Sequence, residues 1–164
     1  MDKFPQTDNY STPPEALQLI CKYVPMDSVI WDPFYCDGLM KKQLVAIGYD
    51  DEKIIHEQVD FFTLDEFPNY DVLLSSPPFS KMRWILPHIA ATNKPFALLT
   101  NLNSIQSNYM KNCMRGKEVQ ILCPQRPVRF IKNGEQLKTG CTLATVWVTW
   151  GLHIPRNKCL TGYI

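Results

Sequence analysis

The chain has 164 residues, of which 45% are hydrophobic and 20% charged. This length and composition suit a single folded domain over residues 1–164 and exclude an intrinsically disordered chain. The first twelve residues are polar, and no stretch reaches the roughly 18 apolar residues that a membrane-spanning helix needs. We therefore expect a soluble intracellular protein without a membrane partner.

The formal net charge of +1 hides an uneven distribution. Residues 1–79 have five lysines and fourteen acids, a net −9, whereas residues 80–164 have twelve basic residues and two acids, a net +10. The total by itself argues against a nucleic-acid-binding protein, but the basic second half favours a polyanionic or phosphate-bearing partner. The alternative is that the two halves pack together and neutralise each other within one domain.

The apolar pattern predicts that helices and strands alternate. A helix begins at Thr12-Pro13-Pro14-Glu15, with Thr12 as its N-cap, and ends before Pro25. Further helices are expected over residues 38–47, 80–91 and 104–114, and strands over residues 28–31, 53–56, 71–75, 96–100, 119–123 and 143–150. Residues 124–138 are expected to form a long loop or a hairpin arm. This alternation predicts a three-layer α/β fold with a mainly parallel central sheet.

Ligands of such sheets bind beyond the carboxyl ends of the strands. The first three expected strands end at Asp32-Pro33-Phe34, at His56-Glu57 followed by Asp60-Phe61-Phe62, and at Ser76-Pro77-Pro78-Phe79. Two consecutive prolines end a strand and stiffen the turn that follows. Such a turn has a purely structural interpretation, but it also suits a site that must hold hydrogen-bond acceptors still.

The order and spacing of these strand ends resemble those of S-adenosylmethionine-dependent amino-group DNA methyltransferases, in particular the small adenine-N6 methyltransferases of phages and large viruses. The resemblance covers nearly the whole chain. Its strongest element is Ser76-Pro77-Pro78-Phe79, which is similar to the family's motif of Asp, Asn or Ser, two prolines and an aromatic residue. It implies a Rossmann-like methyltransferase fold of reduced size and an enzyme that methylates an exocyclic amine of a DNA base, with adenine N6 favoured over cytosine N4.

The resemblance also implies how this motif acts. A base amine is a poor nucleophile because its lone pair is delocalised into the ring, and two acceptors at its N–H bonds free that lone pair. These would be Ser76 Oγ and the carbonyl oxygen of Pro77, held by Pro78, while Phe79 would stack on a base swung out of the duplex. A serine hydroxyl is a weaker acceptor than a carboxylate. Because serine also occurs here in many cytosine-N4 enzymes, the target base stays open.

Two segments would hold the methionine end of S-adenosylmethionine, by the same resemblance. Asp32 would bind the ammonium group, with Phe34 and Gly38 forming the turn around it. Tyr10 and Thr12 resemble a Tyr-x-Thr-Pro element that contacts the methionine end.

A further segment would hold the adenosine part. Glu57 would accept from the ribose hydroxyls, a role that His56 or a neighbour could also perform. Asp60 would accept from the adenine amine, with Phe61 packing on the ring. The alternative interpretation is that Phe61 and Phe62 fill the hydrophobic core.

The sequence departs from the family at two further points. Cys36 stands where the family often has a glycine, and the short stretch between the second and third strands indicates that a strand and a helix are missing there. The cysteines and histidines show no metal-ligand spacing, so no metal is expected.

The remaining length leaves no room for a separate target-recognition domain, so loops must contact the nucleic acid. Residues 125–138 combine a phenylalanine, Phe130, with a single acid and four basic residues: Arg126, Arg129, Lys132 and Lys138. This pattern is typical of phosphate contact plus base stacking, although a solvated basic arm is the alternative. DNA is the expected partner, and the oligomeric state is left open between a monomer and a homo- or hetero-oligomer.

Two other functions stay compatible with the sequence. One is a methyltransferase-like subunit that binds nucleic acid or a partner protein with weak or no catalysis, which Cys36 and Ser76 favour. The other is the same chemistry on RNA or on a free nucleotide.

Overall fold

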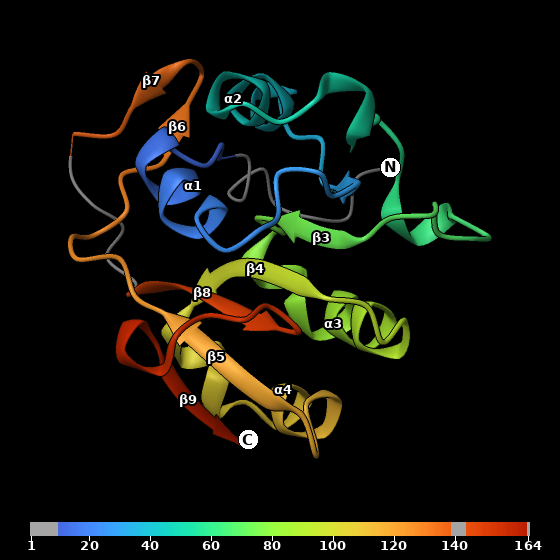
Figure 1. Ribbon diagram of the computed structural model, residues 1–164, viewed down its shortest axis with the longest axis vertical. Helices are drawn as coiled ribbons and strands as arrows, with labels where there is room; N and C mark the ends of the chain where they lie inside the picture. Colours follow the sequence, from blue (N-terminus) through green and yellow to red (C-terminus); the bar gives the residue numbers. More distant parts are fainter. Residues whose placement is uncertain (1–9, 139–143, 164) are drawn as a thin grey trace.

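The computed structural model describes residues 10–138 and 144–163, and seven strands form its main sheet in the order β2-β1-β3-β4-β8-β5-β9 (Figure 1). The strands of this sheet are β1 Ile30–Trp31, β2 Ile54–Ile55, β3 Val72–Ser75, β4 Phe96–Asn101, β5 Glu118–Leu122, β8 Thr145–Trp150 and β9 Leu160–Tyr163. β2, β1, β3 and β4 are parallel. β5 shares their direction because β8 lies between β4 and β5 and is antiparallel to both. The expected α/β fold with a mainly parallel sheet is confirmed.

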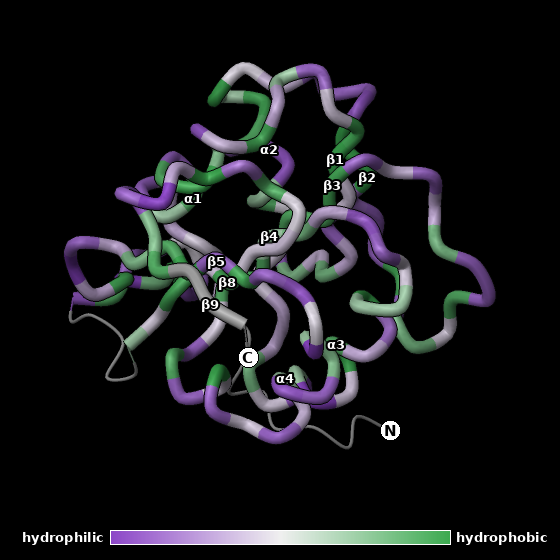
Figure 2. Tube along the Cα trace, turned by 60° about the horizontal axis from the view of Figure 1, so that its bottom comes forward, coloured by the Kyte–Doolittle hydropathy of each residue, from purple (hydrophilic) through white to green (hydrophobic). Residues whose placement is uncertain are grey.

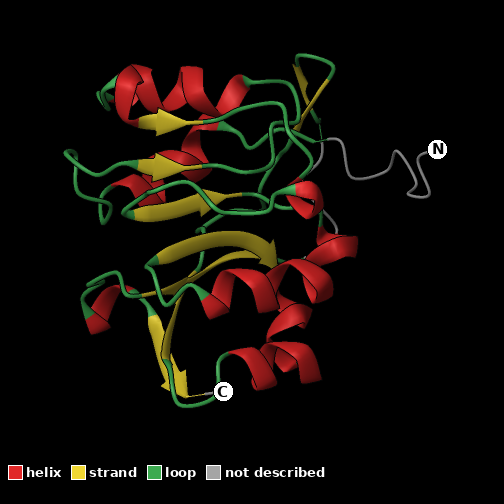
Figure 3. Ribbon diagram, turned by 90° about the vertical axis from the view of Figure 1, so that its right-hand side faces the viewer, coloured by secondary structure: helices red, strands yellow, loops and turns green. Residues whose placement is uncertain are grey.

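Helices cover both faces of the sheet. They are α1 Pro14–Cys21, α2 Leu39–Ile47, α3 Met82–Ala91 and α4 Asn108–Cys113. Leu74 of β3 packs in one core cluster with Leu17 of α1, whereas its neighbour Leu73 packs in the other with Ile85 of α3. This follows from the alternation of side chains along a strand. Figure 3 shows the strands one below another with helices outside them, and Figure 2 shows many of the outer loops in hydrophilic colours.

Several boundaries differ from those expected. The helix expected over residues 104–114 is divided into a 3₁₀ helix, η5 (Leu102–Gln106), and α4, because Ser107 caps α4 by accepting from the Met110 amide. The strand expected over residues 143–150 begins at Thr145 within the described part of the chain, and Leu143 lies outside the described residues. It is also not the last strand, since β9 follows it and pairs with β5.

The arm expected over residues 124–138 is a hairpin of β6 (Ile131–Lys132) and β7 (Glu135–Gln136). It stands beside α1 in Figure 1, and the Gln136 amide donates to Glu15 of α1 at 2.7 Å. The backbone of Ile131 also pairs with Ser11, so the hairpin is joined to the segment that precedes α1.

Thr12 is not the N-cap of the first helix. Pro13 occupies that position, and its carbonyl oxygen accepts from the amides of Ala16 and Leu17. With Thr12 as the cap, the second helical position would be Pro14, which has no N–H, so the amide of Glu15 at the third position would be the one left for the cap to bind. Because Pro13 takes the cap position, the threonine hydroxyl is left for another contact.

The sheet ends at β2 on the side where a strand and a helix were expected to be missing. Residues 56–71 contain one short 3₁₀ helix, η3 (Phe61–Thr63), and no strand. Within residues 10–138 and 144–163, no helix is long and apolar enough to cross a membrane.

Candidate active site

The order of the strands reverses at β1. Its Trp31 pairs with Ile55 of β2 on one side and with Leu73 of β3 on the other, all in parallel register. The residues that follow these three strands therefore leave the sheet at the same edge, which is where ligands of open α/β sheets bind.

A cleft lies at this edge and has two adjoining parts. The inner part has about 20 Å³ of space, roughly the room of one water-sized group, and Thr12 and Asp32 are among its walls. The outer part has about 260 Å³ and is bounded by Asp60, Pro78 and Lys81, among others. The predicted site residues that line one or both parts are Tyr10, Thr12, Asp32, Phe34, Asp60, Phe61, Ser76 and Pro78.

Asp32 is the buried charge of the inner part. Its Oδ1 accepts from the Ser75 hydroxyl and from the Phe34 amide at 3.2 Å, and its Oδ2 lies 3.1 Å from Nδ1 of His56. The carboxylate and the imidazole are each 1% exposed. The sequence did not indicate this network, because periodicity carries no information on which side chains meet across paired strands.

His56 has the geometry of a counter-ion to Asp32. Its Nδ1 also lies 3.2 Å from the Asp32 carbonyl oxygen, and since both neighbouring oxygens accept, this nitrogen carries a proton. Burial lowers the pKa of His56, but the hydrogen bond and the negative charge of Asp32 outweigh it and raise the pKa above its usual value. Nε2 is buried and has no hydrogen-bond partner in the described part of the chain.

The turn between β1 and α2 depends on a glycine. Gly38 has φ +75°, and a Cβ atom there would lie 2.8 Å from the Tyr35 hydroxyl. The Tyr35 ring in turn stacks on His56, with 4.9 Å between ring centroids. Cys36 also has a positive φ of 51°, so the residue that replaces the family's glycine still has the left-handed conformation. Gly38 thus shapes the cleft wall through Tyr35 without lining either part itself.

Gly38→Ala is expected to lower the free energy of unfolding by about 2 kcal/mol or more, since left-handed backbone strain adds to the contact with Tyr35. Gly116→Ala is a matched control because Gly116 has φ +76° and no atom within 4 Å of the added Cβ. Its cost is expected to be about 1 kcal/mol, from the backbone alone. Equal costs in urea unfolding would contradict a clash at Gly38.

The segment after β2 differs in part from the expectation. Glu57 is exposed and lines neither part of the cleft, because the Val59 amide donates to the Glu57 carbonyl and the bend presents Gln58 and Val59 instead. The ribose role assigned to Glu57 stays a prediction, with Gln58 the polar side chain of this segment at the cleft. The Asp60 carboxylate is at the cleft and accepts from the Phe62 amide at 3.0 Å.

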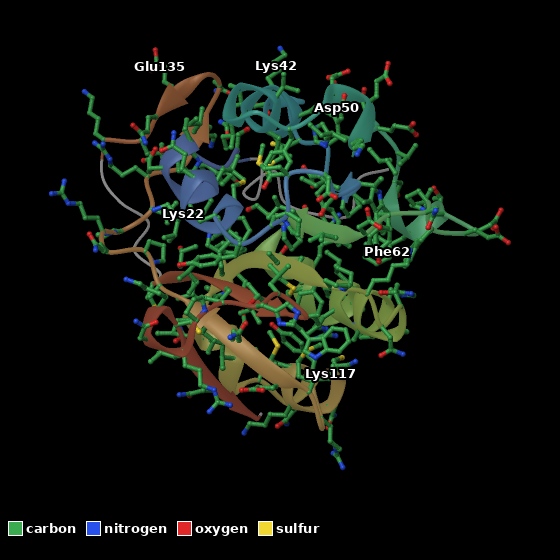
Figure 4. All side chains as sticks on the ribbon, in the orientation of Figure 1. Lys22, Lys42, Asp50, Phe62, Lys117 and Glu135 are labelled. Carbon is green, nitrogen blue, oxygen red and sulfur yellow. The ribbon has the colours of Figure 1, made fainter. Side chains whose placement is uncertain are left out.

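Phe61 and Phe62 have different surroundings. Phe61 is 5% exposed and packs on Trp31 and Phe34, so it is chiefly a core residue with one edge at the cleft. Phe62 is 45% exposed, lines the outer part and is labelled at the surface in Figure 4. The interpretation of both rings as core holds for Phe61 and is wrong for Phe62, which sequence reasoning did not consider as a cleft residue.

The Ser76-Pro77-Pro78-Phe79 motif follows β3 and enters the cleft at its first and third residues. Ser76 lines both parts and Pro78 the outer part, while Pro77 is buried. Phe79 packs edge-on against Phe130 of the arm, with 6.0 Å between ring centroids. Stacking of Phe79 on a base stays a prediction.

The arm has an apolar inner side and a basic outer side. Val128 and Phe130 are buried in the core, and Phe130 also contacts Tyr10 at 6.3 Å between centroids. The expected role of Phe130 as a stacking partner in the loop is therefore wrong in this structure, since the ring anchors the arm beside the cleft. The four expected basic contacts are exposed: Arg126, Arg129, Lys132 and Lys138. Glu135 is labelled at the end of the hairpin in Figure 4.

The residues of the cleft fit the amino-acid end of S-adenosylmethionine. Thr12 Oγ1 is buried beside the inner part and has no hydrogen-bond partner among the described residues, and the space there matches a small charged group such as an ammonium. The outer part offers aromatic and acidic walls and approaches the lower end of the roughly 300–1,000 Å³ range of small-molecule sites. No group of three or more His, Cys, Asp or Glu residues suited to a metal ion occurs in the described ranges.

No protein-family model matches the sequence, and no curated protein matches it. Solved structures share its fold. A dimethyladenosine transferase from Plasmodium falciparum is 11% identical, with a TM-score of 0.51 over 87% of this chain and 62% of that chain. A precorrin-6y C5,15-methyltransferase from Geobacter metallireducens is 12% identical, with a TM-score of 0.50 over 92% of this chain and 99% of that chain.

These comparisons define the class of fold. The chain has a small Rossmann-like methyltransferase fold, as its sequence implied. It spans less than two thirds of the length of the dimethyladenosine transferase chain.

Proposed function

We propose that this protein transfers the methyl group of S-adenosylmethionine to an exocyclic amine of a DNA base, with adenine N6 favoured over cytosine N4. The observation that carries the proposal is that one cleft at the reversal point of the sheet gathers Asp32, Thr12, Asp60 and Ser76. These are the residues that the family resemblance assigns to the two ends of the cofactor and to the target amine. The name of the dimethyladenosine transferase with the similar fold is in line with an adenine target.

For this reaction the protein mainly has to position the reacting groups and to supply hydrogen-bond acceptors. When bound, S-adenosylmethionine supplies an activated methyl group on a positively charged sulfur. Ser76 Oγ and the Pro77 carbonyl would accept from the target amine and free its lone pair to take the methyl group, with the electrons of the broken carbon–sulfur bond left on sulfur. The amine proton then leaves to water. Because Pro77 is buried and both residues are fixed in the turn after β3, these acceptors need no reorganisation.

The exposed basic side of the arm is proposed to hold the DNA backbone. Arg129 lies between buried Val128 and Phe130, so the arm cannot turn this charge inward without losing its apolar anchor, and Lys132 is exposed two residues after Phe130. Lys132 Nζ also lies 5.1 Å from the centre of the Tyr10 ring at the cleft. A phosphate bound by the arm would therefore lie near the cleft, and its binding would weaken with salt.

Ser76→Ala is expected to lower the rate of methyl transfer to DNA at least tenfold, since it removes a polar group of a kind that contributes about 10²–10⁴. Pro77→Ala keeps the backbone carbonyl and is expected to lower the rate less, because it only loosens the turn that holds both acceptors. The assay measures tritium from labelled S-adenosylmethionine in DNA, and mass analysis of nucleosides from the digested product identifies the modified base. Ser28→Ala is the matched control, because Ser28 precedes β1 at the opposite edge of the sheet. Unchanged transfer in Ser76→Ala would refute the hydroxyl as an acceptor, and unchanged transfer in Pro77→Ala would refute the need for a stiff turn.

One observation favours a second function, a methyltransferase-like subunit that binds nucleic acid with weak or no catalysis. Both oxygens of the Asp32 carboxylate already have protein partners, so its charge is partly satisfied without a cofactor. Calorimetry separates the two functions. Failure to bind millimolar S-adenosylmethionine, with DNA binding retained, would favour the binding subunit, whereas micromolar binding supports the enzyme.

A further inference from the structure

The Asp32 carboxylate has a partner of its own in His56, whose pKa is raised by that carboxylate. The two side chains are 3.1 Å apart and equally buried, and the carboxylate borders a space of about 20 Å³. A second cation entering that space would share the same carboxylate. One buried negative charge stabilises one positive charge well, but two positive charges at the same carboxylate repel each other.

Apart from Asp32, the charged residues that line a hollow together with His56 are Lys41, Lys42 and Asp51. Lys41 of α2 acts on the imidazole as a positive charge and is itself paired with Asp51 at 3.4 Å. Tyr35 covers one face of the ring, and the adjacent Glu57 is exposed to solvent. The charge of His56 therefore depends mainly on Asp32.

We propose that His56 is a positioning residue that loses a proton to solvent when Asp32 receives the ammonium group of S-adenosylmethionine. This deepens the proposed function and rests on it. In the free protein the imidazolium holds the Asp32 carboxylate in place, and in the complex the neutral ring still donates its Nδ1–H to it. The carboxylate thus keeps its orientation while the net charge at the site stays balanced, because one cation replaces another.

This exchange makes binding depend on pH. Below the raised pKa of His56 the cofactor must displace a proton, and above it no proton has to leave. The affinity for S-adenosylmethionine should therefore increase with pH through that pKa, by up to about tenfold per pH unit for one linked proton. A neutral nucleoside without an ammonium group should show no such linkage.

The experiment is calorimetric titration of the intact protein at several pH values, in buffers with different enthalpies of ionisation. The ligands are S-adenosylmethionine and 5′-methylthioadenosine, which lacks the amino-acid end. Wild type should release a fraction of a proton with the first ligand and none with the second. The side-chain amide of His56→Asn can donate in place of Nδ1, so this variant should still bind S-adenosylmethionine. Its binding should release no proton from residue 56, and the only proton exchange left should be that of the ligand's own amino group.

The outcomes distinguish a failure of the role of His56 from a failure of the proposed function. Binding of S-adenosylmethionine with equal proton exchange in wild type and His56→Asn would overturn the role of His56 and leave the proposed function intact. No binding by wild type at any pH would overturn both. If His56→Asn does not fold, the two ligands are compared on wild type near pH 6, where the α-amino group of S-adenosylmethionine, with a usual pKa of about 7.7–8.0, is already protonated and contributes no proton exchange. A proton count that differs between the ligands at this pH then supports displacement at Asp32, and equal counts overturn it.

Discussion

Replacing Asp32 by asparagine is expected to lower the free energy of unfolding by about 3–5 kcal/mol near pH 6 and to weaken the binding of S-adenosylmethionine about hundredfold. The substitution leaves the His56 imidazolium buried without its partner and removes the acceptor proposed for the ammonium group. Urea unfolding measures the first effect and calorimetry the second. Asp71→Asn is the matched control, because the Asp71 carboxylate also accepts a backbone N–H, from Val29 at 2.8 Å, but is exposed.

The same variant should change the dependence of stability on pH. The pKa of His56 is raised in the folded protein, so folding takes up a proton and the stabilisation is fully present below the unfolded value of about 6.5. It is lost as the pH rises through the folded-state pKa. The free energy of unfolding of wild type should therefore fall over this range, whereas that of Asp32→Asn should stay level or rise, because burial then lowers the pKa of His56 without an opposing charge. Parallel curves for the two proteins would rule out a charged His56–Asp32 pair.

Trp147→Ala is expected to cost about 3–5 kcal/mol of stability, because it removes a large side chain from the centre of the core. Trp147 of β8 is 0% exposed, and its indole N–H donates to the Ala16 carbonyl of α1 at 3.0 Å. This contact joins the sheet to the helix that follows Tyr10 and Thr12. The loss should be measured by urea unfolding, and cofactor affinity should fall with it as the cleft wall loosens.

Two comparisons make this prediction specific. Trp147→Phe keeps most of the apolar volume and should cost about 1–2 kcal/mol, including the carbonyl left without its donor. Trp84→Ala deletes the same side chain from a half-exposed position on α3 and should cost less than about 1 kcal/mol. A similar cost at positions 84 and 147 would contradict the core position of Trp147.

Local chain chemistry predicted the elements that contain strong signals. Apolar runs ended by prolines indicated β1 and β3, and the helix expected over residues 38–47 ends where α2 ends, at Ile47. The strand β9 has no such signal, because it is only four residues long and is stabilised by its pairing with β5. Thr12 was wrong as a cap because the helix begins one residue later, with Pro13 at the cap position.

In the candidate site, too, some features could be predicted from local sequence and others could not. The Ser76-Pro77-Pro78 turn and the Asp32 turn could be predicted, since their residue types set backbone geometry and polarity at strand ends. His56 and Ser75 could not, because their contacts with Asp32 depend on the register that pairs Trp31 with Ile55 and Leu73. The contact of Phe130 with Phe79 likewise depends on how the arm folds back, which no local pattern encodes.

By itself, the sequence determined the alternation of elements, the fold that this alternation requires and the polar residues at the strand ends, because propensity, proline placement and periodicity are local properties. Only the tertiary structure decided which of those residues share a cleft, that Phe130 anchors the arm, and that the Asp32 carboxylate lies against the buried imidazole of His56. These features depend on strand register and on contacts between residues that are far apart in the sequence. Asp32 and His56 become a pair because the fold buries their side chains against each other.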